Sequence, residues 1–336
     1  MKISYVGNIS NDIITGPHVY QDIVIRYMGE RHDVRILSPD DDIEENITTT
    51  DIVHFLDIFW ARKRLIERVK NFRIPVVIDV HDYYWTEFYP YRSPDLPLRL
   101  ARQQFMKRRN LELLALADAV VTHCNYVKNK IPHPRVANVS VYVISDNMRT
   151  PKPFRERRDE ILFVGRNFFR KGLHTLLRAM PIVLKECPSA KLLVVGQERL
   201  HTLLAARWLA RGLPVSFLGG LSSRDTLKLY GKVKVFVLPS EIEASPVSPL
   251  EAIACGTPVV CSAVGGIPEL IEHGVTGMLC RPGDYHTLAQ YIVRCLQDEI
   301  FSMQLVENGQ AALQERFAVE LMIERIEQVY QGVMSR

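Results

Sequence analysis

The sequence predicts an α/β protein built from two doubly wound, Rossmann-like domains that face a cleft. Three observations lead to this fold class. Short, β-branched apolar runs alternate with helical patterns along the whole chain, which favours parallel sheets with helices on both faces. A length of 336 residues suits two domains, and 47% hydrophobic with 24% charged residues is typical of a globular protein. A charged, proline-bearing segment without periodicity, at 150–159, separates the two halves.

The first half begins with a strand, because residues 2–6 form a short apolar run. A polar loop that reaches Gly16 follows, and then a helical pattern. Residues 75–80 are typical of a strand that is buried on both faces, and they end in His81. The predicted strands are 2–6, 33–37, 51–56, 75–80, 119–122 and 139–144, and the predicted helices are 18–29, 60–72, 96–116 and 125–131.

The alternation restarts after the linker. The run 233–238 is the most apolar of the second half, and a helix that begins near Ser248 follows it. The last helix, 317–330, has one apolar stripe along its length. The predicted strands are 161–164, 192–195, 215–218, 233–238 and 258–261, and the main helices are 172–187, 198–211, 248–256, 285–297 and 317–330.

Charge and cysteine content exclude several classes of protein. A formal charge of +4 suits an anionic ligand but is too small to indicate a nucleic-acid partner. The six cysteines contain no CxxC spacing, so we expect buried free thiols and neither a zinc site nor disulfides. The chain starts directly with a strand, which predicts no signal peptide, and turn residues interrupt the apolar tract 252–268. We therefore expect a cytoplasmic protein.

Two carboxylates follow the central strand 233–238. Glu243 lies in the polar loop after it, and Glu251 lies in the first turn of the next helix. Ligands of open α/β sheets bind at the carboxyl ends of strands, which makes both residues candidates. Ser248 as N-cap with Glu251 three residues later also forms a capping-box pattern, so a purely structural role for Glu251 stays open.

The loop 165–172 follows the first strand of the second half and contains Arg166 and Lys171. Two cations beside a helix N-terminus, with free backbone N–H groups, form a site for a diphosphate. The alternative is that both are solvated loop cations. Gly265 and Gly266 follow a later strand, where they either let the backbone approach a ligand or form an ordinary turn.

No G-x-G-x-x-G follows any predicted strand and no Walker-type motif is present, which argues against a dehydrogenase or an NTPase. Two positions in the first half are further candidates. His81 lies at the carboxyl end of a strand, where it could contact an acceptor hydroxyl or be structural. Gly16 precedes the first long helix and could bring backbone to a phosphate.

Together, these motifs resemble the retaining family-4 glycosyltransferases of the GT-B fold, within glycosyl transferases group 1. Five elements in the right order over about 120 residues are far more specific than any one of them. The weaker resemblance of the first half rests on residues 51–54, 81–82 and 117–121. The elements that carry the resemblance are Gly165-Arg166 with Lys171-Gly172, Pro239-Ser240, Glu243 with Glu251, residues 251–260, and 265–269.

The resemblance implies a nucleoside-diphosphate sugar held mainly by the second domain. Arg166 and Lys171 would bind the diphosphate, Glu243 the sugar and Glu251 the ribose, and His81 would lie beside the reacting centre. The remaining contacts that it implies are backbone groups of Val247 and Ser248 on sugar and phosphate, Gly16 near the donor phosphate, and Gly219, Gly220 and Leu221 around the base.

The resemblance also divides the chain. It implies an acceptor-binding domain over 1–150, a nucleotide-sugar-binding domain over 151–316, and a C-terminal helix, 317–336, that crosses back to the first domain. The family often has Gly-Phe after the first glutamate, where this chain has Ala244-Ser245-Pro246. Pro246 removes one N–H group, so the identity of the donor sugar is what this departure puts in doubt.

The predicted activity is transfer of a sugar to an acceptor hydroxyl on a glycan, a lipid or a small molecule, with retention. The donor is a co-substrate, and no cofactor or metal is expected because the cations can stabilise the leaving diphosphate. Two alternatives stay open: a sugar-nucleotide epimerase of the same architecture, and a non-catalytic sugar-nucleotide-binding protein.

The segment 92–109 is rich in arginine and lysine and is preceded by a cluster of aromatic residues. Such a segment either contacts an anionic membrane surface or is a solvated helix with its apolar side in the core. The first interpretation predicts a peripheral protein at the inner face of the membrane.

Overall fold

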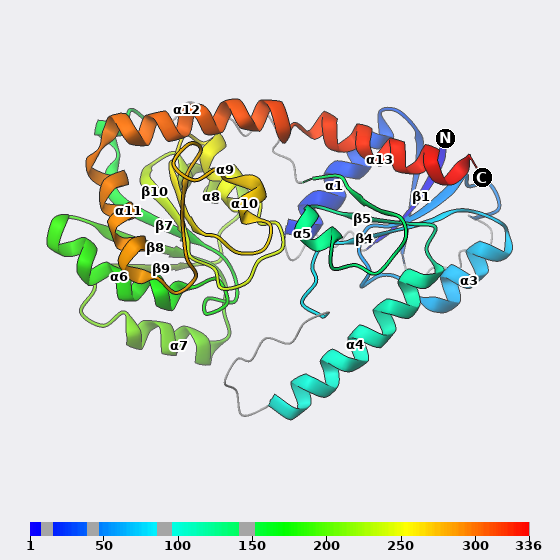
Figure 1. The fold of residues 1–336 in the computed structure, drawn as a ribbon, viewed down its shortest axis with the longest axis horizontal. Coiled ribbons are helices and arrows are strands. Elements are labelled where there is room, and N and C mark those ends of the chain that lie inside the picture. The colour runs from blue at the N-terminus through cyan, green and yellow to red at the C-terminus, as the bar shows by residue number, and fades with distance from the viewer. Residues whose placement is uncertain (8–15, 39–46, 86–95, 141–151, 336) are drawn as a thin grey trace. The chain divides into compact units, whose positions relative to one another are not determined.

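The computed structural model describes residues 1–7, 16–38, 47–85, 96–140 and 152–335. The chain folds into two compact units. Unit 1 comprises Met1–Val141 and Glu320–Arg336, and unit 2 comprises Tyr142–Val319. The chain thus begins in unit 1, forms unit 2, and returns to unit 1 with its last helix, as colour shows in Figure 1.

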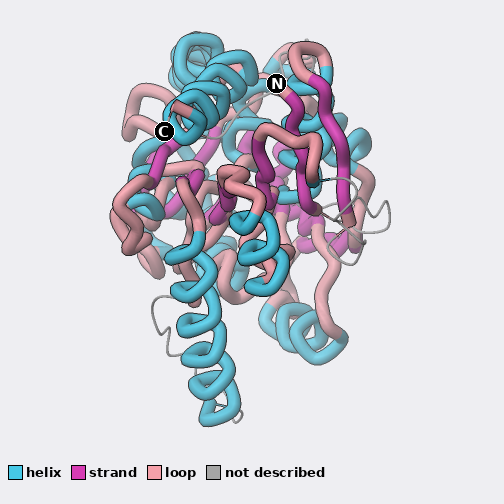
Figure 2. Tube along the Cα trace, turned by 90° about the vertical axis from the view of Figure 1, so that its right-hand side faces the viewer, coloured by secondary structure: helices cyan, strands magenta, loops and turns pink. Residues whose placement is uncertain are grey.

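Unit 1 contains a parallel six-stranded sheet with the strand order β2-β1-β3-β4-β5-β6. Figure 2 shows the strands in the interior of the unit with helices outside them. The strands are β1 (Lys2–Val6), β2 (Asp33–Leu37), β3 (Ile52–Phe55), β4 (Val76–Val80), β5 (Ala119–Thr122) and β6 (Val136–Asn138), and the helices are α1 (Gly16–Gly29), α3 (Lys63–Asn71), α4 (Leu96–Leu116), α5 (Asn125–Lys128) and α13 (Val319–Met334).

Unit 2 contains a second parallel six-stranded sheet with the order β12-β11-β10-β7-β8-β9. β7 and β10 are neighbours in the sheet, and the strands that follow each of them in the chain are added in opposite directions, as in Rossmann-type sheets. The strands are β7 (Arg158–Val164), β8 (Lys191–Val195), β9 (Val215–Gly219), β10 (Val233–Leu238), β11 (Val259–Ser262) and β12 (Met278–Cys280), and the helices are η2 (Phe154–Glu156), α6 (Leu173–Glu186), α7 (Leu200–Leu209), α8 (Ser223–Tyr230), α9 (Ser248–Ala254), α10 (Ile267–Leu270), α11 (Tyr285–Gln297) and α12 (Glu299–Arg316).

The central strands are buried along nearly their whole length, which explains their uniform apolar character. All five residues of β4 are buried, and five of the six residues of β10 are buried. A strand covered by helices on both faces needs apolar side chains on both faces. The predicted strand 233–238 is confirmed with the same bounds.

Helix α13 completes the core of unit 1. The Tyr330 hydroxyl lies 2.9 Å from the hydroxyl of Tyr5 on β1 and 2.7 Å from Nδ1 of His54 on β3. Nearer the surface, Glu327 pairs with His32 at 2.8 Å and with Arg31 at 3.1 Å. Two parallel doubly wound sheets with a C-terminal helix that returns to the first unit constitute the GT-B fold, as predicted.

Three local predictions differ from the structure. The strand expected at 139–144 is wrong in its described part, because β6 ends at Asn138 and Ser140 adopts a positive φ of 68°. Residues 141–144 lie outside the described residues. Gly16 is the first residue of helix α1 and not part of a loop. The linker expected at 150–159 contains η2 and the first residues of β7, which begins at Arg158.

The described helices include none with the length and apolarity needed to cross a membrane. All six cysteines are buried free thiols, as predicted.

Candidate functional site

The sheet of unit 2 places two loops side by side at its switch point. β7 and β10 are hydrogen-bonded neighbours, and the loops 165–172 and 239–247 follow their carboxyl ends. Connections from adjacent strands diverge at such a point and leave room for a ligand. The predicted site residues of unit 2 concentrate on these two loops and on helix α9, which follows the second loop.

Lys171 and Glu243 form an ion pair that joins the two loops. The side chains are 15% and 4% exposed, so the pair is largely desolvated. Ser240 donates a second hydrogen bond to the same Glu243 oxygen at 2.9 Å. A buried carboxylate held by an ammonium and a hydroxyl has a fixed orientation, and it holds the lysine at the mouth of the sheet.

Two glycines allow this close approach of loops. A Cβ atom on Gly172, whose φ is 76°, would lie 1.7 Å from the carbonyl oxygen of Pro239. A Cβ atom on Gly265 would lie 1.8 Å from the carbonyl oxygen of Glu243. Of the two interpretations of the Gly265-Gly266 pair, the structure therefore favours packing of backbone on backbone, since Gly266 also donates its N–H to Ala244 at 2.7 Å.

The capping-box interpretation of Glu251 is wrong. Helix α9 begins at Ser248, and the residue before it, Val247, caps the helix in a helical conformation without a side-chain hydrogen bond. The Glu251 carboxylate accepts instead from the hydroxyl of Tyr230, on α8, at 3.4 Å. Burial raises the pKa of Glu251 above its ordinary value. The carboxylate thus lies in the N-terminal turn of α9 without capping it.

We expected free backbone N–H groups in loop 165–172, but two of these groups are already hydrogen-bonded within the chain. Asn167, with a φ of 58°, and Phe168 both donate their N–H to Glu198, which follows β8; the Phe168 bond is 3.2 Å long. A carboxylate of this chain therefore occupies the anion-binding turn. The sequence pattern had no signal for Glu198, because the contact joins residues 31 positions apart. The side chain of Arg166, in the same loop, is exposed to solvent.

The remaining predicted residues of unit 2 lie at the same carboxyl edge. Gly219 ends the edge strand β9 with a φ of 71°, and its carbonyl accepts from Gly196 at 2.8 Å. Gly220 and Leu221 are exposed in the loop that follows. Gly16, in contrast, belongs to unit 1.

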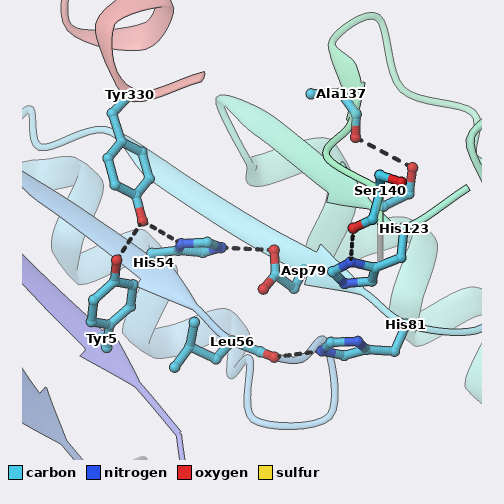
Figure 3. Close-up of polar contacts among 10 residues, drawn as sticks. Tyr5, His54, Leu56, Asp79, His81, His123, Ala137, Ser140 and Tyr330 are labelled. Atoms are coloured by element: carbon cyan, nitrogen blue, oxygen red, sulfur yellow. Dashed lines mark hydrogen bonds and ion pairs between the residues drawn. The ribbon is translucent and has the colours of Figure 1, made fainter. Parts of the chain in front are cut away.

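His81 of unit 1 follows β4, as predicted, and lies in a cluster that the sequence did not reveal (Figure 3). Its Nε2 donates to the carbonyl of Leu56 at 2.9 Å. Its ring stacks on that of His123, which follows β5, with centroids 4.6 Å apart and an interplanar angle of 11°. Tyr20 packs edge-on against both rings.

Next to these rings lies a buried chain of polar groups (Figure 3). Asp79 and His54 are fully buried and pair at 2.8 Å. His54 donates to Asp79 through Nε2, its Nδ1 lies 2.7 Å from the hydroxyl of Tyr330, and that hydroxyl lies 2.9 Å from the hydroxyl of Tyr5. Burial opposes ionisation of Asp79, but the charge and hydrogen bond of His54 keep the pKa of this carboxyl below its ordinary value.

Asp79, His81 and His123 are also the described residues that could together hold a metal ion, with one ligand atom of each within 4.8 Å of the others. The second oxygen of Asp79 has no hydrogen-bond partner among the described residues. However, an imidazole binds a metal in the plane of its ring, and the two rings are nearly parallel and stacked. Their lone pairs do not converge on one point, which disfavours a shared ion in this arrangement.

We expect His123 to make unit 1 less stable as the pH falls. Burial and the neighbouring His81 lower its pKa from 6.5 to about 3. Below pH 6.5 the unfolded chain binds a proton here that the folded chain does not, so stability falls by about 1.4 kcal/mol per pH unit down to about pH 3. Urea unfolding at pH 7 and pH 5 measures this contribution, about 2 kcal/mol. His123→Asn should flatten the pH dependence and the exposed His201→Asn should not; an unchanged slope in His123→Asn would contradict the prediction.

Comparison with known proteins places the chain in a family. The model of the family Glycosyl transferases group 1 matches residues 145–312, half of the chain. Among structures, sucrose-phosphate synthase from Thermosynechococcus elongatus superposes with a TM-score of 0.81 at 19% identity, covering 99% of both chains. Anabaena HepE in complex with UDP-glucose superposes with a TM-score of 0.74 at 19% identity, covering 99% of this chain and 100% of that one.

The curated relatives align with about half of the chain. An uncharacterized glycosyltransferase of Methanocaldococcus jannaschii is 34% identical over 191 residues, 56% of this chain and 49% of the relative. A GDP-mannose-dependent phosphatidylinositol monomannoside mannosyltransferase of Corynebacterium glutamicum is 30% identical over 170 residues, 48% and 44% of the two chains. The alignments thus span about half the length of these relatives. The fold defines a protein of the GT-B class, and the chain belongs to the Glycosyl transferases group 1 family.

Proposed function

We propose that the chain is a retaining glycosyltransferase that moves a sugar from a nucleoside-diphosphate sugar to an acceptor hydroxyl. The Lys171–Glu243 ion pair at the switch point of unit 2 carries the proposal. It puts a cation and a hydrogen-bonding carboxylate side by side, which is what a diphosphate and its attached sugar require.

The shared chemistry of the similar proteins supports this donor class. One is described as GDP-mannose-dependent, and another was solved with UDP-glucose. The bases of these two donors differ but both contain a diphosphate. A site whose side chains contact the diphosphate, and whose base contacts come from the backbone of Gly219, Gly220 and Leu221, is compatible with either base.

The proposed reaction breaks the bond between the anomeric carbon and the bridging oxygen, and the electron pair goes to the departing diphosphate. Arg166, Lys171 and the N–H groups of Val247 and Ser248 stabilise that charge, so the proposal needs no metal. The acceptor oxygen attacks the face from which the diphosphate departs, and its proton passes to a phosphate oxygen. Glu243 holds the sugar, and His81 contacts the reacting groups.

One assay tests the proposal and its alternatives. The protein is incubated with UDP-, GDP- and ADP-sugars, and release of nucleoside diphosphate is measured with and without glycan, lipid and small-molecule acceptors. Acceptor-dependent release, with NMR showing the anomeric configuration of the donor kept in the product, supports transfer. An altered sugar epimer would indicate an epimerase, and binding without turnover would indicate a non-catalytic binding protein.

Glu251→Gln is expected to weaken donor binding about tenfold to hundredfold, because a charged hydrogen bond to the ribose contributes about 1.5–3 kcal/mol. Isothermal titration with the donor identified by the assay measures the change. The exposed Glu272→Gln is the matched control, and equal donor affinity in both variants would remove Glu251 from the site.

A further inference from the structure

Helix α7 of unit 2 turns a row of large apolar side chains to solvent. Leu200, Leu204 and Trp208 are 70%, 54% and 64% exposed. They are spaced four residues apart, so they follow one another on successive turns of one face. Leu209, at 40%, adds to the exposed apolar surface.

The other side of the same helix is packed in the ordinary way. Ala206 and Ala210 belong to the core of unit 2, and Leu203 packs against that core. Helix α7 lies beside α6 at the outside of the unit (Figure 1). A helix that is apolar on both sides is normally covered on both sides, so the row Leu200–Leu204–Trp208 is a surface without its partner in the isolated chain.

The charges around this row have one sign. Arg199, Arg207 and Arg211 are all exposed, and the sequence from 199 to 213 contains no aspartate or glutamate. The nearest acid before it, Glu198, is already bound to the backbone of loop 165–172. Helical spacing puts Arg207 one turn from Leu204, and Arg211 follows the end of the helix one turn after Trp208, so cations and apolar side chains share the exposed face.

We propose that α7 is a membrane-contact helix that lies flat on an anionic phospholipid surface. Leucine and tryptophan side chains would enter the boundary between headgroups and acyl chains, and the arginines would pair with lipid phosphates. This surface is separate from the segment 92–109 and belongs to the unit that we propose binds the donor.

The same charges argue against a second copy of this chain as the occupant. In a two-fold contact each copy presents the same surface to the other. Three arginines of one copy would then face three of the other, without an acid on the helix to pair with them. An anionic membrane surface can bind both the apolar row and the arginines of α7.

Binding to vesicles tests the proposal with the full chain. We expect sedimentation with vesicles of phosphatidylglycerol and phosphatidylcholine at low salt, weaker binding at high salt, and little binding to phosphatidylcholine alone. Leu204→Glu and Trp208→Glu should each weaken partitioning at least about tenfold. The control Ile300→Glu introduces the same charge at an apolar residue that is 84% exposed on α12 and should bind like the parent chain.

Tryptophan fluorescence locates the contact. Trp85 is only 5% exposed and Trp60 is half-buried, whereas Trp208 is 64% exposed, so quenching by brominated lipids should come mainly from Trp208 and largely disappear in Trp208→Phe. Absence of vesicle binding, or binding that Leu204→Glu leaves unchanged, would overturn the proposal. Binding lost in Phe105→Glu on α4 but kept in both α7 variants would assign the contact to the other segment. Concentration-dependent dimers that Trp208→Glu abolishes would show a second copy as the occupant. Donor binding should be unchanged in all of these variants, which separates this proposal from that of the transferase.

Discussion

Replacing Lys171 with alanine is expected to lower the turnover of sugar transfer about 10²–10³-fold, or about 3–4 kcal/mol in activation free energy. The ammonium is one of the preorganised charges that we propose meet the departing diphosphate. Its side chain is only 15% exposed and is held by Glu243, so solvent cannot replace it in the same position. Steady-state release of nucleoside diphosphate measures the effect.

Loss of activity must be separated from loss of structure, because Lys171→Ala leaves the carboxylate of Glu243 buried beside Ser240 alone. Breaking a buried pair in this way costs about 3–5 kcal/mol of stability. Lys234→Ala is the matched control: this lysine is 16% exposed, pairs with Asp159 at 2.7 Å, and lies toward the amino end of β10. It should lose stability but keep turnover when folded.

A second comparison uses a cation of the same loop that is exposed and not buried. Arg166 is exposed, so Arg166→Ala is expected to lower turnover while leaving the unfolding temperature unchanged. Lys171→Arg keeps the cation and should recover part of the activity that alanine loses. If folded Lys171→Ala and Lys234→Ala turn over equally fast, the diphosphate role of Lys171 is refuted.

Replacing His54 with alanine should destabilise unit 1 by about 3–5 kcal/mol, because Asp79 would then be a fully buried charge without its partner. For a unit of this size, such a loss lowers the unfolding temperature by about 10 °C. Tyr330→Phe removes one hydroxyl from the same chain of hydrogen bonds and should cost only about 1–2 kcal/mol. Thermal unfolding followed by circular dichroism measures both.

The pH dependence of the stability loss in His54→Ala distinguishes an unpaired buried charge on Asp79 from a cavity left by the missing imidazole. Without His54, burial, the largest influence on the pKa of Asp79, is opposed only by His123 and His81, so we expect this pKa to rise above the value in the unfolded chain. The folded variant then binds the additional proton, so its deficit should shrink as the pH falls toward the new pKa. The exposed pair of Lys70 and Asp118 is the control, and Lys70→Ala should cost less than about 1 kcal/mol. A deficit in His54→Ala that stays constant with pH would exclude the buried charge as its cause.

Much of the fold follows from local patterns. The strand 233–238 was predictable because an apolar run of six residues bounded by Pro239 is short enough to be a strand and too apolar for an edge. Loop 165–172 was also predictable from a local pattern, since its cations lie between an apolar run typical of a strand and the start of a helix. The strand Val136–Asn138 was missed, because the apolar run that begins at Val139 indicated a strand later in the chain than the residues that pair.

The contacts within the candidate site were less accessible to sequence reasoning. Glu198 reaches the turn at Asn167 across 31 residues, and Tyr330 reaches His54 across 276 residues. No local pattern predicts pairs at such separations. Asp79 resembled any polar residue in a buried strand, and only the structure shows that His54, His81 and His123 surround it.

The hydrogen bonds of Tyr330 also impose an order on biosynthesis. Unit 2 is one uninterrupted segment, Tyr142–Val319, and can close as soon as that segment leaves the ribosome. Unit 1 cannot form the hydrogen bond between His54 and Tyr330 until residue 330 has been translated, although its six strands emerged first. During elongation, the earliest part of the nascent polypeptide therefore waits longest for its final packing.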